Sequence, residues 1–361
     1  MKNNGVTDVN VVRYSPLVSP RQIIHDVPRT EAAYELVKSS RDAIQSILDG
    51  KDERLLAIVG PCSLHDAENA QAYASAIRPV AEKVANKIYV VMRAYFEKPR
   101  TSLGWKGLIN DPHLDGTYDI NEGYREARRI LNIMAKEGMS AATEYLETIT
   151  PQYNSDMIAW AAIGARTAYS PVHRELASGL SMPVGIKNDT HGDISVAVNG
   201  VIAARDNHVF PGLDPDGNIA LIYTRGNAYA HIVLRGGDTG PNYDQGSVEK
   251  AQKMLSERGI PNRLIIDCSH DNTLVEWETE YKKDYKRQVI VFQEGIRQRV
   301  DGNKGVVGLM VESHIEDGNQ PVPVDLSTLD KSALRFGTSI TDKCLPLETT
   351  IKLLEEAYSD L

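Results

Sequence analysis

The sequence predicts an α/β protein, a (β/α)8 TIM barrel with an N-terminal extension and an inserted β-hairpin. From about residue 51, short apolar runs of strand length alternate with longer amphipathic segments almost to the end of the 361-residue chain. The strand-like runs number eight, which is the strand count of this barrel. We therefore expect residues 1–50 to form an arm and a helix, and residues 51–361 to form the catalytic barrel.

The elements follow from the periodicity of the apolar residues. Residues 1–30 show no sustained period, whereas apolar residues recur at helical spacing after Thr30, as at Leu36, Val37 and Ile44. We expect strands at 54–63, 87–95, 140–146, 165–170, 182–188, 230–237, 263–270 and 305–313. We expect helices at 66–85, 120–139, 193–207 and 346–361.

One stretch departs from the alternation. Between a helix that ends near Asn207 and the strand at 230 lie two further strand-like pieces, 208–213 and 218–224, joined by a turn-rich segment. A barrel does not need this pair for closure, so we expect an inserted β-hairpin at about 208–224. By itself it could be a surface insertion or an interface element.

Composition excludes several function classes. Lys and Arg total 40 against 49 for Asp and Glu, and the net charge of −9 argues against binding to the nucleic-acid backbone. Three cysteines do not make a disulfide framework and favour a reducing cytoplasm. No apolar run reaches the roughly 18 residues of a membrane span, and the N-terminus lacks a signal-like apolar region. We expect a cytoplasmic protein without nucleic-acid or membrane partners.

Polar residues lie in or beside the expected strands, most of them at the C-terminal ends, where barrel active sites form. Burial of so many charges indicates a site or a dense ion-pair core. One set of these residues is cationic and suits the binding of phosphate and carboxylate groups, with the Thr101 hydroxyl beside it. The cations are Arg93, Lys98, Arg100, Arg166, Lys187 and Arg235. A second group offers S, N and O donors that could hold a divalent metal: Cys62, His270, Glu312 and Asp342.

The cysteines also have plainer interpretations. Without the barrel context, Cys62 would be a small buried thiol, because no CxxC or HExxH motif accompanies it. Strand alternation places Cys268 on the face of His270 but deeper in the strand, so we expect it to fill the barrel. Cys344 receives no assignment.

A series of motifs runs through the chain in order. These are GPCSLHD (60–66), VMRAYFEKPRT (91–101), GWKGLINDP (104–112), IGART (163–167), HRELASGL (173–180), PVGIKN (183–188), VLRGG (233–237), DCSH (267–270), VES (311–313) and SITD (339–342). From about residue 30 onward the chain closely resembles 3-deoxy-D-arabino-heptulosonate 7-phosphate (DAHP) synthases of the short, feedback-regulated microbial class. The resemblance implies a metal-dependent barrel that condenses phosphoenolpyruvate with D-erythrose 4-phosphate and releases phosphate, the first step of the shikimate pathway.

Position by position, the resemblance implies roles for individual residues. One divalent ion (Mn, Fe, Co or Zn) would be held by Cys62, His270, Glu312 and Asp342. Phosphoenolpyruvate would bind Arg93, Lys98, Arg166, Lys187 and Arg235, with Glu144 nearby, and the sugar phosphate would bind Arg100 and Thr101. The catalytic set would be Lys98, Glu144, Lys187 and His270, with Glu144 or Lys187 serving the water that adds to C2.

The resemblance further implies a homodimer or homotetramer and feedback inhibition. The family uses the hairpin, the 173–180 helix and the start of the 151–160 helix as a pocket for an aromatic amino acid. The matching residues are Pro151, Gln152, Leu176, Leu180, Ser181, Phe210, Gly212 and Ile222. Phenylalanine-sensitive members usually carry Ser at the position of Gly212 and tyrosine-sensitive members Gly, which favours tyrosine as the effector, with tryptophan second.

Two departures from the family pattern border the inferred site. Asp189-Thr190-His191-Gly192 replaces the usual Gly-Thr-Asp-Gly, and Ala168-Tyr169-Ser170 replaces Thr-Glu-Ser. The cations are intact, so we expect altered loop packing or affinity. Three alternatives stay open: the related synthase that uses arabinose 5-phosphate, a Schiff-base aldolase that uses Lys187, and a non-catalytic sugar-phosphate sensor, which would need the cations but no metal ligands.

Overall fold

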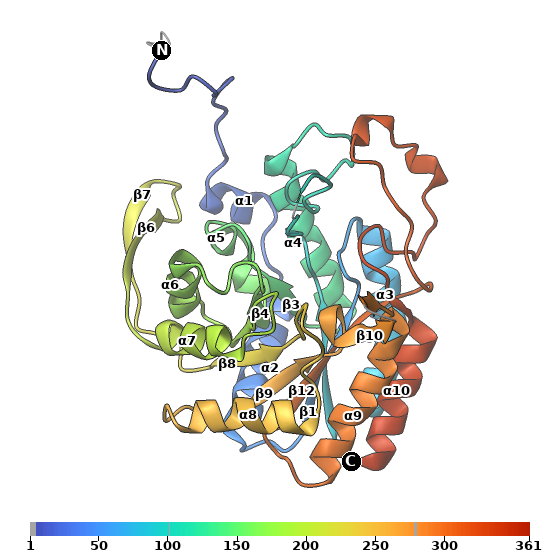
Figure 1. Ribbon diagram of the computed structural model, residues 1–361. Helices are drawn as coiled ribbons and strands as arrows, with labels where there is room; N and C mark the ends of the chain where they lie inside the picture. Colours follow the sequence, from blue (N-terminus) through green and yellow to red (C-terminus); the bar gives the residue numbers. More distant parts are fainter. Residues whose placement is uncertain (1–4, 101, 278–279) are drawn as a thin grey trace.

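A computed structural model describes residues 5–100, 102–277 and 280–361 (Figure 1). Eight parallel strands close into a barrel in the order β1-β2-β3-β4-β5-β8-β9-β12, and β12 pairs with β1. Their bounds are β1 (Leu55–Gly60), β2 (Ile88–Arg93), β3 (Ala141–Glu144), β4 (Trp160–Ile163), β5 (Val184–Lys187), β8 (Ala230–Leu234), β9 (Leu264–Asp267) and β12 (Val306–His314). The short strand β13 (Leu345–Pro346) extends the sheet beside β12. The predicted (β/α)8 fold is confirmed.

Helices surround the barrel (Figure 1). They are α3 (Ala67–Lys83), α4 (Ile120–Lys136), α5 (Pro151–Asn154), α6 (Pro171–Gly179), α7 (Ile194–Arg205), α8 (Gln245–Ser256), α9 (Gln288–Val300) and α10 (Leu347–Asp360). The four predicted barrel helices are confirmed to within a few residues. Side chains of Asp66, Asp119 and Asp193 accept hydrogen bonds from backbone N–H groups and so fix where three of these helices begin.

Strand alternation sorts the buried residues into two layers. Leu56, Ile58 and Trp160 belong to the cluster inside the barrel, whereas Leu55 and Ala57 pack with the helices. The α2 helix (Glu31–Asp49) begins at the Thr30 cap, and its Ile44, Ile47 and Leu48 join the interior cluster. Because these contacts lie at the N-terminal ends of the strands, α2 closes that end of the barrel and the C-terminal end carries the site.

Three sequence predictions are wrong. The helix expected at 151–160 is one turn, Pro151–Asn154, followed by a 3-10 turn at Ser155–Met157, because the chain must become extended to enter the strand that begins at Trp160. The strand expected at 165–170 is a run of turns, and the fourth strand is Trp160–Ile163. Its alanines are weak strand formers, and pairing with β3 and β5 overrides that preference. Cys268 packs in the helix-facing layer instead of filling the barrel, because β9 ends at Asp267 and the alternation does not extend to His270.

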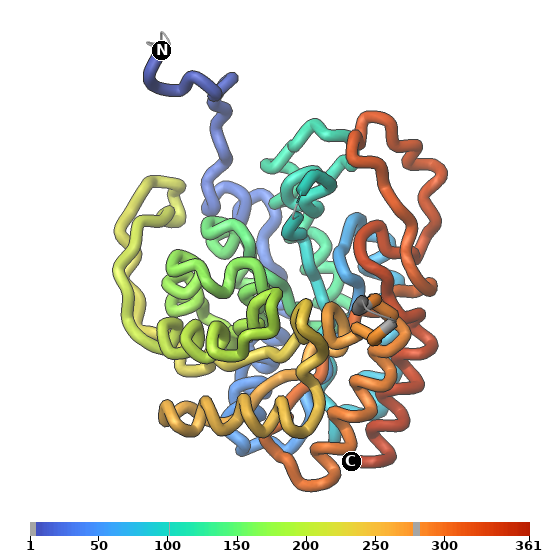
Figure 2. Tube along the Cα trace, in the orientation of Figure 1, coloured from blue at the N-terminus to red at the C-terminus, as the bar shows by residue number. Residues whose placement is uncertain are grey.

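Two hairpins and a short helix are added to the barrel. The predicted hairpin is present as β6 (Val209–Leu213) and β7 (Ile219–Tyr223). A helix α1 (Pro20–Asp26) lies within the expected arm, and Arg21 N donates to Pro215 O in the hairpin turn over 2.8 Å. Residues 5–19, before α1, run away from the barrel (Figure 2).

The second hairpin, β10 (Leu274–Trp277) with β11 (Glu280–Lys283), follows β9 and was not predicted.

Across the described part of the chain, no helix has both the length and the apolar character needed to cross a membrane.

Candidate active site

A cavity of about 490 Å³ opens at the C-terminal ends of the barrel strands. Among the described residues, seven cationic side chains and three carboxylates line it, although the chain has a net charge of −9. The cations are Lys98, Arg100, Arg166, Lys187, Arg235, Lys283 and Lys343, and the carboxylates are Glu144, Glu312 and Asp342. A strongly anionic small molecule suits this lining. Sequence reasoning missed Lys283 and Lys343.

Lys187 ends β5 and lies buried between two carboxylates. Its Nζ is 3.1 Å from Asp267 Oδ2 and 3.5 Å from Glu144 Oε2. Burial disfavours the ammonium ion, but Asp267, Tyr95 and Glu144 outweigh burial and hold the pKa of Lys187 above its ordinary value. A lysine held as a cation suits anion binding and opposes Schiff-base formation, which requires the neutral amine.

Glu144 ends β3 on the inner face of the barrel. A Cβ at Gly164 would lie 2.4 Å from Glu144 Oε1, so this glycine makes room for the carboxylate. Burial opposes ionisation of Glu144, but Lys187, followed by Lys98 and His270, keeps its pKa below the ordinary value. Glu144 and Lys187 therefore form a buried pair of opposite charges.

Asp267 is a buried residue of the site that sequence reasoning missed. Its Oδ2 lies 3.1 Å from Lys187 Nζ and 2.9 Å from His270 Nδ1, and its Oδ1 accepts a 2.7 Å hydrogen bond from Ser269 Oγ. Asp267 thus joins the substrate-side lysine to a predicted metal ligand. Ile265 faces the interior of the barrel, and strand alternation places position 267 on the same face. This alternation could have identified Asp267 as a site residue from the sequence.

The predicted metal ligands come from four separate segments. One ligand atom each of Cys62, Glu312 and Asp342 lies within 4.8 Å of the other two. His270 Nε2 is 3.7 Å from Glu312 Oε1, while its Nδ1 faces Asp267. The backbone of His270 has φ of 58°, a left-handed conformation that is uncommon for a residue with a side chain. The S, N and O donors fit a divalent transition metal, with Asp267 orienting the imidazole.

The charges around Cys62 also fit a cation. Burial raises the pKa of the Cys62 thiol to about 12, and the carboxylates of Glu312 and Asp342 add to this effect. Lys98 acts in the opposite direction, with its Nζ 2.9 Å from Cys62 Sγ. Cys344, unassigned from sequence, lies behind the site, where its Sγ accepts from Cys62 N over 3.4 Å.

Arg93 lies behind the cavity and does not line it. Its side chain is fully buried, and its guanidinium donates to Glu312 Oε1 over 3.0 Å and to Pro61 O over 3.2 Å. It also stacks over the Tyr95 ring at 3.9 Å. In this position Arg93 orients Glu312, whereas the resemblance implied direct contact with phosphoenolpyruvate.

The remaining predicted cations surround the mouth of the cavity. Arg100 follows β2 and donates from Nε to Trp105 O over 2.8 Å, while Arg166 is exposed in the turn after β4. Thr101 lies outside the described residues. β2 and β8 are opposite one another in the closed strand order, so the loop that carries Arg100 and the segment that carries Arg235 leave the barrel on opposite sides.

Both departures from the family pattern are accommodated at the rim. Ala168 is buried and Tyr169 is exposed. Asp189 is buried and accepts from the backbone N of His191 and Asp193. His191 pairs with Asp238 at 2.7 Å, which ties the loop after β5 to the loop after β8.

Glu97 anchors the loop that carries Lys98 and Arg100. Its carboxyl group is buried and accepts from the backbone N of Leu146 and Glu147 and from Thr150 Oγ1 at 3.0–3.3 Å. Burial raises the pKa of Glu97 to about 8, even though these hydrogen bonds favour the ionised form.

We expect the wild-type chain to lose stability relative to Glu97→Gln as the pH rises from about 6 to about 9. The folded pKa of about 8 exceeds the ordinary value of 4.5, so the protonated group stabilises the fold at low pH and this contribution is lost as the pH rises through the folded pKa. The difference in unfolding free energy between the two proteins should change by about 2–3 kcal/mol. Urea unfolding at both pH values measures it, and an unchanged difference would contradict the expectation.

The eight predicted regulatory residues come from α5, α6, the turn after α6 and the β6–β7 hairpin, on one side of the barrel (Figure 1). Pro151 and Leu176 are buried, Gln152 and Leu180 are half-buried, and Ser181 is exposed. On the hairpin, Phe210, Gly212 and Ile222 share a half-buried face. A Cβ at Gly212 would lie 2.9 Å from Ile222 Cγ1.

The fold and the site together define a barrel with a cationic substrate cavity beside a candidate metal centre. A family model described as the DAHP synthetase I family matches residues 30–355. The Tyr-sensitive phospho-2-dehydro-3-deoxyheptonate aldolase of Salmonella typhimurium is 42% identical over 100% of this chain and 98% of its own length. The chain therefore belongs to the DAHP synthetase I family and is an enzyme of the phospho-2-dehydro-3-deoxyheptonate aldolase (DAHP synthase) type.

Further relatives support this family membership. The Corynebacterium glutamicum phospho-2-dehydro-3-deoxyheptonate aldolase is 46% identical over 98% of this chain and 93% of its own length. The Phe-sensitive phospho-2-dehydro-3-deoxyheptonate aldolase of Escherichia coli is 43% identical over 97% of this chain and 95% of its own length. A solved structure of the enzyme from Francisella tularensis superposes with a TM-score of 0.91 at 40% identity, covering 97% of this chain and 98% of that one.

Proposed function

We propose that this chain condenses phosphoenolpyruvate with D-erythrose 4-phosphate to give DAHP and inorganic phosphate. The observation that carries the proposal is one cavity in which cations for two anionic substrates adjoin a cluster of S, N and O donors. A phosphate sensor needs the cations, but the buried Cys62 and Glu312 beside Asp342 would have no part in sensing.

The two substrates would use opposite sides of the mouth. Phosphoenolpyruvate carries a carboxylate and a phosphate, which match Lys98, Arg166, Lys187 and Arg235. The phosphate of the sugar would lie across the mouth at Arg100, with Thr101 beside it in the sequence. This separation would bring the C3 end of phosphoenolpyruvate toward the aldehyde in the middle of the cavity.

Cys62, His270, Glu312 and Asp342 would hold one divalent metal ion. When bound, such an ion would polarise the aldehyde oxygen of the sugar phosphate. Arg93 and Asp267 would keep Glu312 and His270 oriented, because each donates to or accepts from one of these residues in the structure.

The buried Glu144–Lys187 pair would transfer protons when water attacks. Attack of C3 on the aldehyde leaves positive character at C2, and water adds there. The ionised Glu144 can accept a proton from that water, and the charged Lys187 can donate to the phosphate side. Cleavage of the C2–O bond then releases phosphate, so the water oxygen stays in the product.

A phosphate-release assay tests the proposal. We expect release only when both substrates are present, loss of release with EDTA, and recovery when Mn²⁺ is added. Activity with arabinose 5-phosphate would indicate the related synthase, and trapping of Lys187 by borohydride would indicate a Schiff-base aldolase. Binding of the substrates without turnover would indicate a sensor.

We propose that tyrosine is the effector and that it binds between the β6–β7 hairpin, α5 and α6. We expect tyrosine to inhibit more strongly than tryptophan or phenylalanine, and Gly212→Ser to weaken tyrosine inhibition by about tenfold or more. The added side chain would displace Ile222 and occupy space that the phenol group needs. Titration of both proteins with the three amino acids measures this, and inhibition of the wild type by phenylalanine alone would contradict it.

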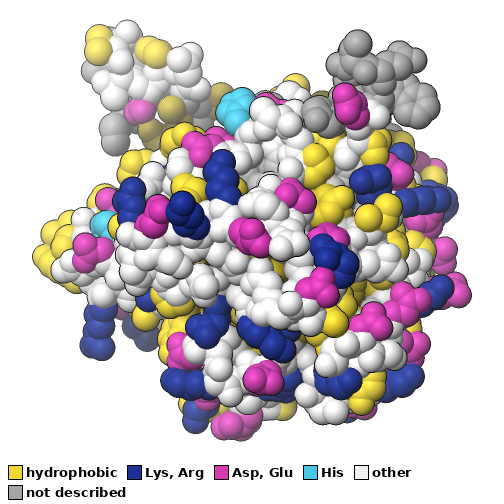
Figure 3. Space-filling model, turned by 60° about the horizontal axis from the view of Figure 1, so that its bottom comes forward, with side chains coloured by type: hydrophobic (Ala, Val, Ile, Leu, Met, Phe, Trp, Pro, Cys, Tyr) yellow, Lys and Arg dark blue, Asp and Glu magenta, His cyan; other side chains and the backbone are white. Residues whose placement is uncertain are grey.

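A homodimer or homotetramer is supported by the outer face of the same hairpin. Val209, Ile219, Leu221 and Tyr223 are 55–87% exposed there. Hydrophobic side chains gather at the left edge of the space-filling view, where the hairpin lies (Figure 3). A second copy of the chain would remove this apolar surface from water.

A further inference from the structure

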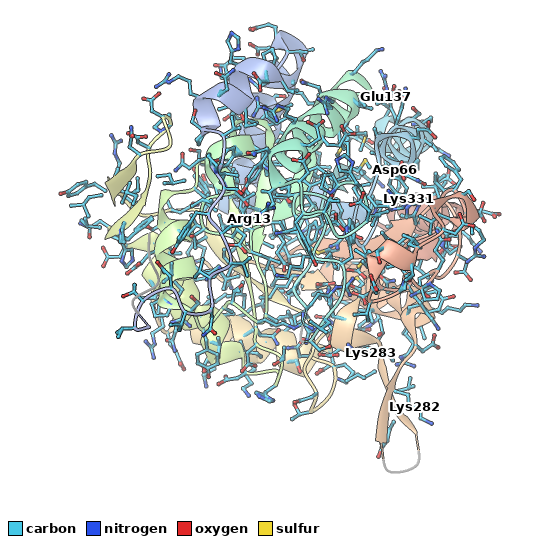
Figure 4. The ribbon with its side chains drawn as sticks, turned by 90° about the horizontal axis from the view of Figure 1, so that it is seen from above. Arg13, Asp66, Glu137, Lys282, Lys283 and Lys331 are labelled. Carbon is cyan, nitrogen blue, oxygen red and sulfur yellow. The ribbon has the colours of Figure 1, made fainter. Side chains whose placement is uncertain are left out.

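Lys283, at the base of the β10–β11 hairpin, lines the cavity but has no role in the proposed function. Lys283 is the last residue of β11, paired with Leu274 at the start of β10. Asp284 N donates to Thr273 O over 3.0 Å, which closes the base of the hairpin directly after the turn that carries His270 and Asp271. The hairpin projects from the barrel, and Lys283 lies at its base while Lys282 lies farther out (Figure 4).

Lys283 is connected to Arg235 through one carboxylate. Its Nζ lies 2.7 Å from Asp271 Oδ1, and Arg235 Nη1 contacts the other oxygen, Oδ2. Backbone hydrogen bonds from Asp271 N and Asn272 N to Arg235 O hold the turn against the end of β8. The side chain of Lys283 is 59% exposed and lines the cavity, whereas Arg235 and Asp271 are mostly buried.

The charge balance of this cluster decides what it can bind. The Asp271 carboxylate lies between two cations, with Oδ1 2.7 Å from Lys283 Nζ and Oδ2 in contact with Arg235 Nη1. With Arg235 alone, Asp271 would neutralise the arginine. With Lys283 on the second oxygen, two cations share one carboxylate and the cluster keeps a net positive charge. The Nε of Arg235 is buried and has no hydrogen-bond partner among the described residues, so it can still donate to a ligand.

We propose that Lys283 is a positioning residue for the phosphoenolpyruvate anion, brought to the cavity by the β10–β11 hairpin. It holds Asp271 so that Arg235 stays available to the anion, and it keeps this side of the cavity positive. The inference rests on the proposed function and deepens it. Since β8 lies opposite β2 in the closed barrel and Asp271 ties Lys283 to Arg235 just after β8, we expect Lys283 to act on phosphoenolpyruvate and not on the sugar phosphate at Arg100.

The test compares Lys283→Met with Lys283→Arg and with Lys286→Met. Lys286 lies three residues away, is 67% exposed and does not line the cavity, so its replacement removes the same charge from the same region. We expect Lys283→Met to raise the KM for phosphoenolpyruvate about fivefold or more, with kcat and the KM for erythrose 4-phosphate changing less than about twofold. Lys283→Arg should restore the KM, and Lys286→Met should leave it unchanged.

Binding of phosphoenolpyruvate, measured by calorimetry on the same proteins as purified, separates this inference from the proposed reaction. If the wild type binds phosphoenolpyruvate but releases no phosphate with either sugar, the proposed reaction fails and the Kd ratio still tests Lys283. An unchanged Kd and KM in Lys283→Met would overturn the inference. Two other results for Lys283→Met would also overturn it: a larger KM for erythrose 4-phosphate in place of phosphoenolpyruvate, or a fall in kcat together with a lower melting temperature. Absence of phosphoenolpyruvate binding to the wild type would overturn it as well.

Discussion

Cys62→Ala should abolish turnover and leave the fold intact. Cys62 is fully buried just beyond the end of β1, and its sulfur is one of the three donors that lie within 4.8 Å of one another. Loss of this ligand should weaken metal binding. If the ion supplies several kcal/mol of stabilisation to the developing charge, its loss corresponds to about a thousandfold or more in kcat.

Cys268→Ala is the matched control for this prediction. Cys268 is equally buried, but it packs in the helix-facing layer and is not one of the clustered donors. Both variants lose one buried sulfur and should show similar, modest losses of stability. Turnover and bound metal should be lost only in Cys62→Ala. Near wild-type activity of Cys62→Ala in metal-free buffer would show that Cys62 is not a metal ligand.

Lys187→Met should have the largest combined effect on binding and on stability. The lysine lies between Glu144 and Asp267, and its removal leaves two buried carboxylates without their shared cation. Breaking a buried ion pair in this way costs about 3–5 kcal/mol of unfolding free energy. Loss of the charge-assisted hydrogen bond that we propose between Lys187 and phosphoenolpyruvate should weaken binding by about ten- to a hundredfold.

The stability part of this prediction is tested by adding Glu144→Gln to Lys187→Met. Neutralising Glu144 removes one of the unpaired charges, so the double variant should be less destabilised than the sum of the two single changes. Urea unfolding of the four proteins measures the coupling, and calorimetry with phosphoenolpyruvate measures binding. Additive losses of stability would contradict the shared ion pair.

Local pattern was sufficient for the barrel and for most of the charged residue types that line its cavity. Seven of the eight strands were predicted at or around their observed positions, most of them from a buried run of large apolar residues. The fourth, Trp160–Ile163, was displaced because two alanines give a weak strand signal and only its neighbours β3 and β5 define it. The β10–β11 hairpin was missed because Leu274–Trp277 and Glu280–Lys283 mix charged and apolar residues without a clear alternation.

The sequence by itself determined the fold class, the residue types of the site and the family resemblance, since these depend on periodicity and on ordered motifs. The tertiary structure decided which of these residues face one another. It placed Arg93 behind Glu312, joined Lys187 to His270 through Asp267, and brought Lys283 to Arg235 through Asp271. These contacts depend on which strand ends meet when the barrel closes, and that closure is set by pairing between residues far apart in the chain.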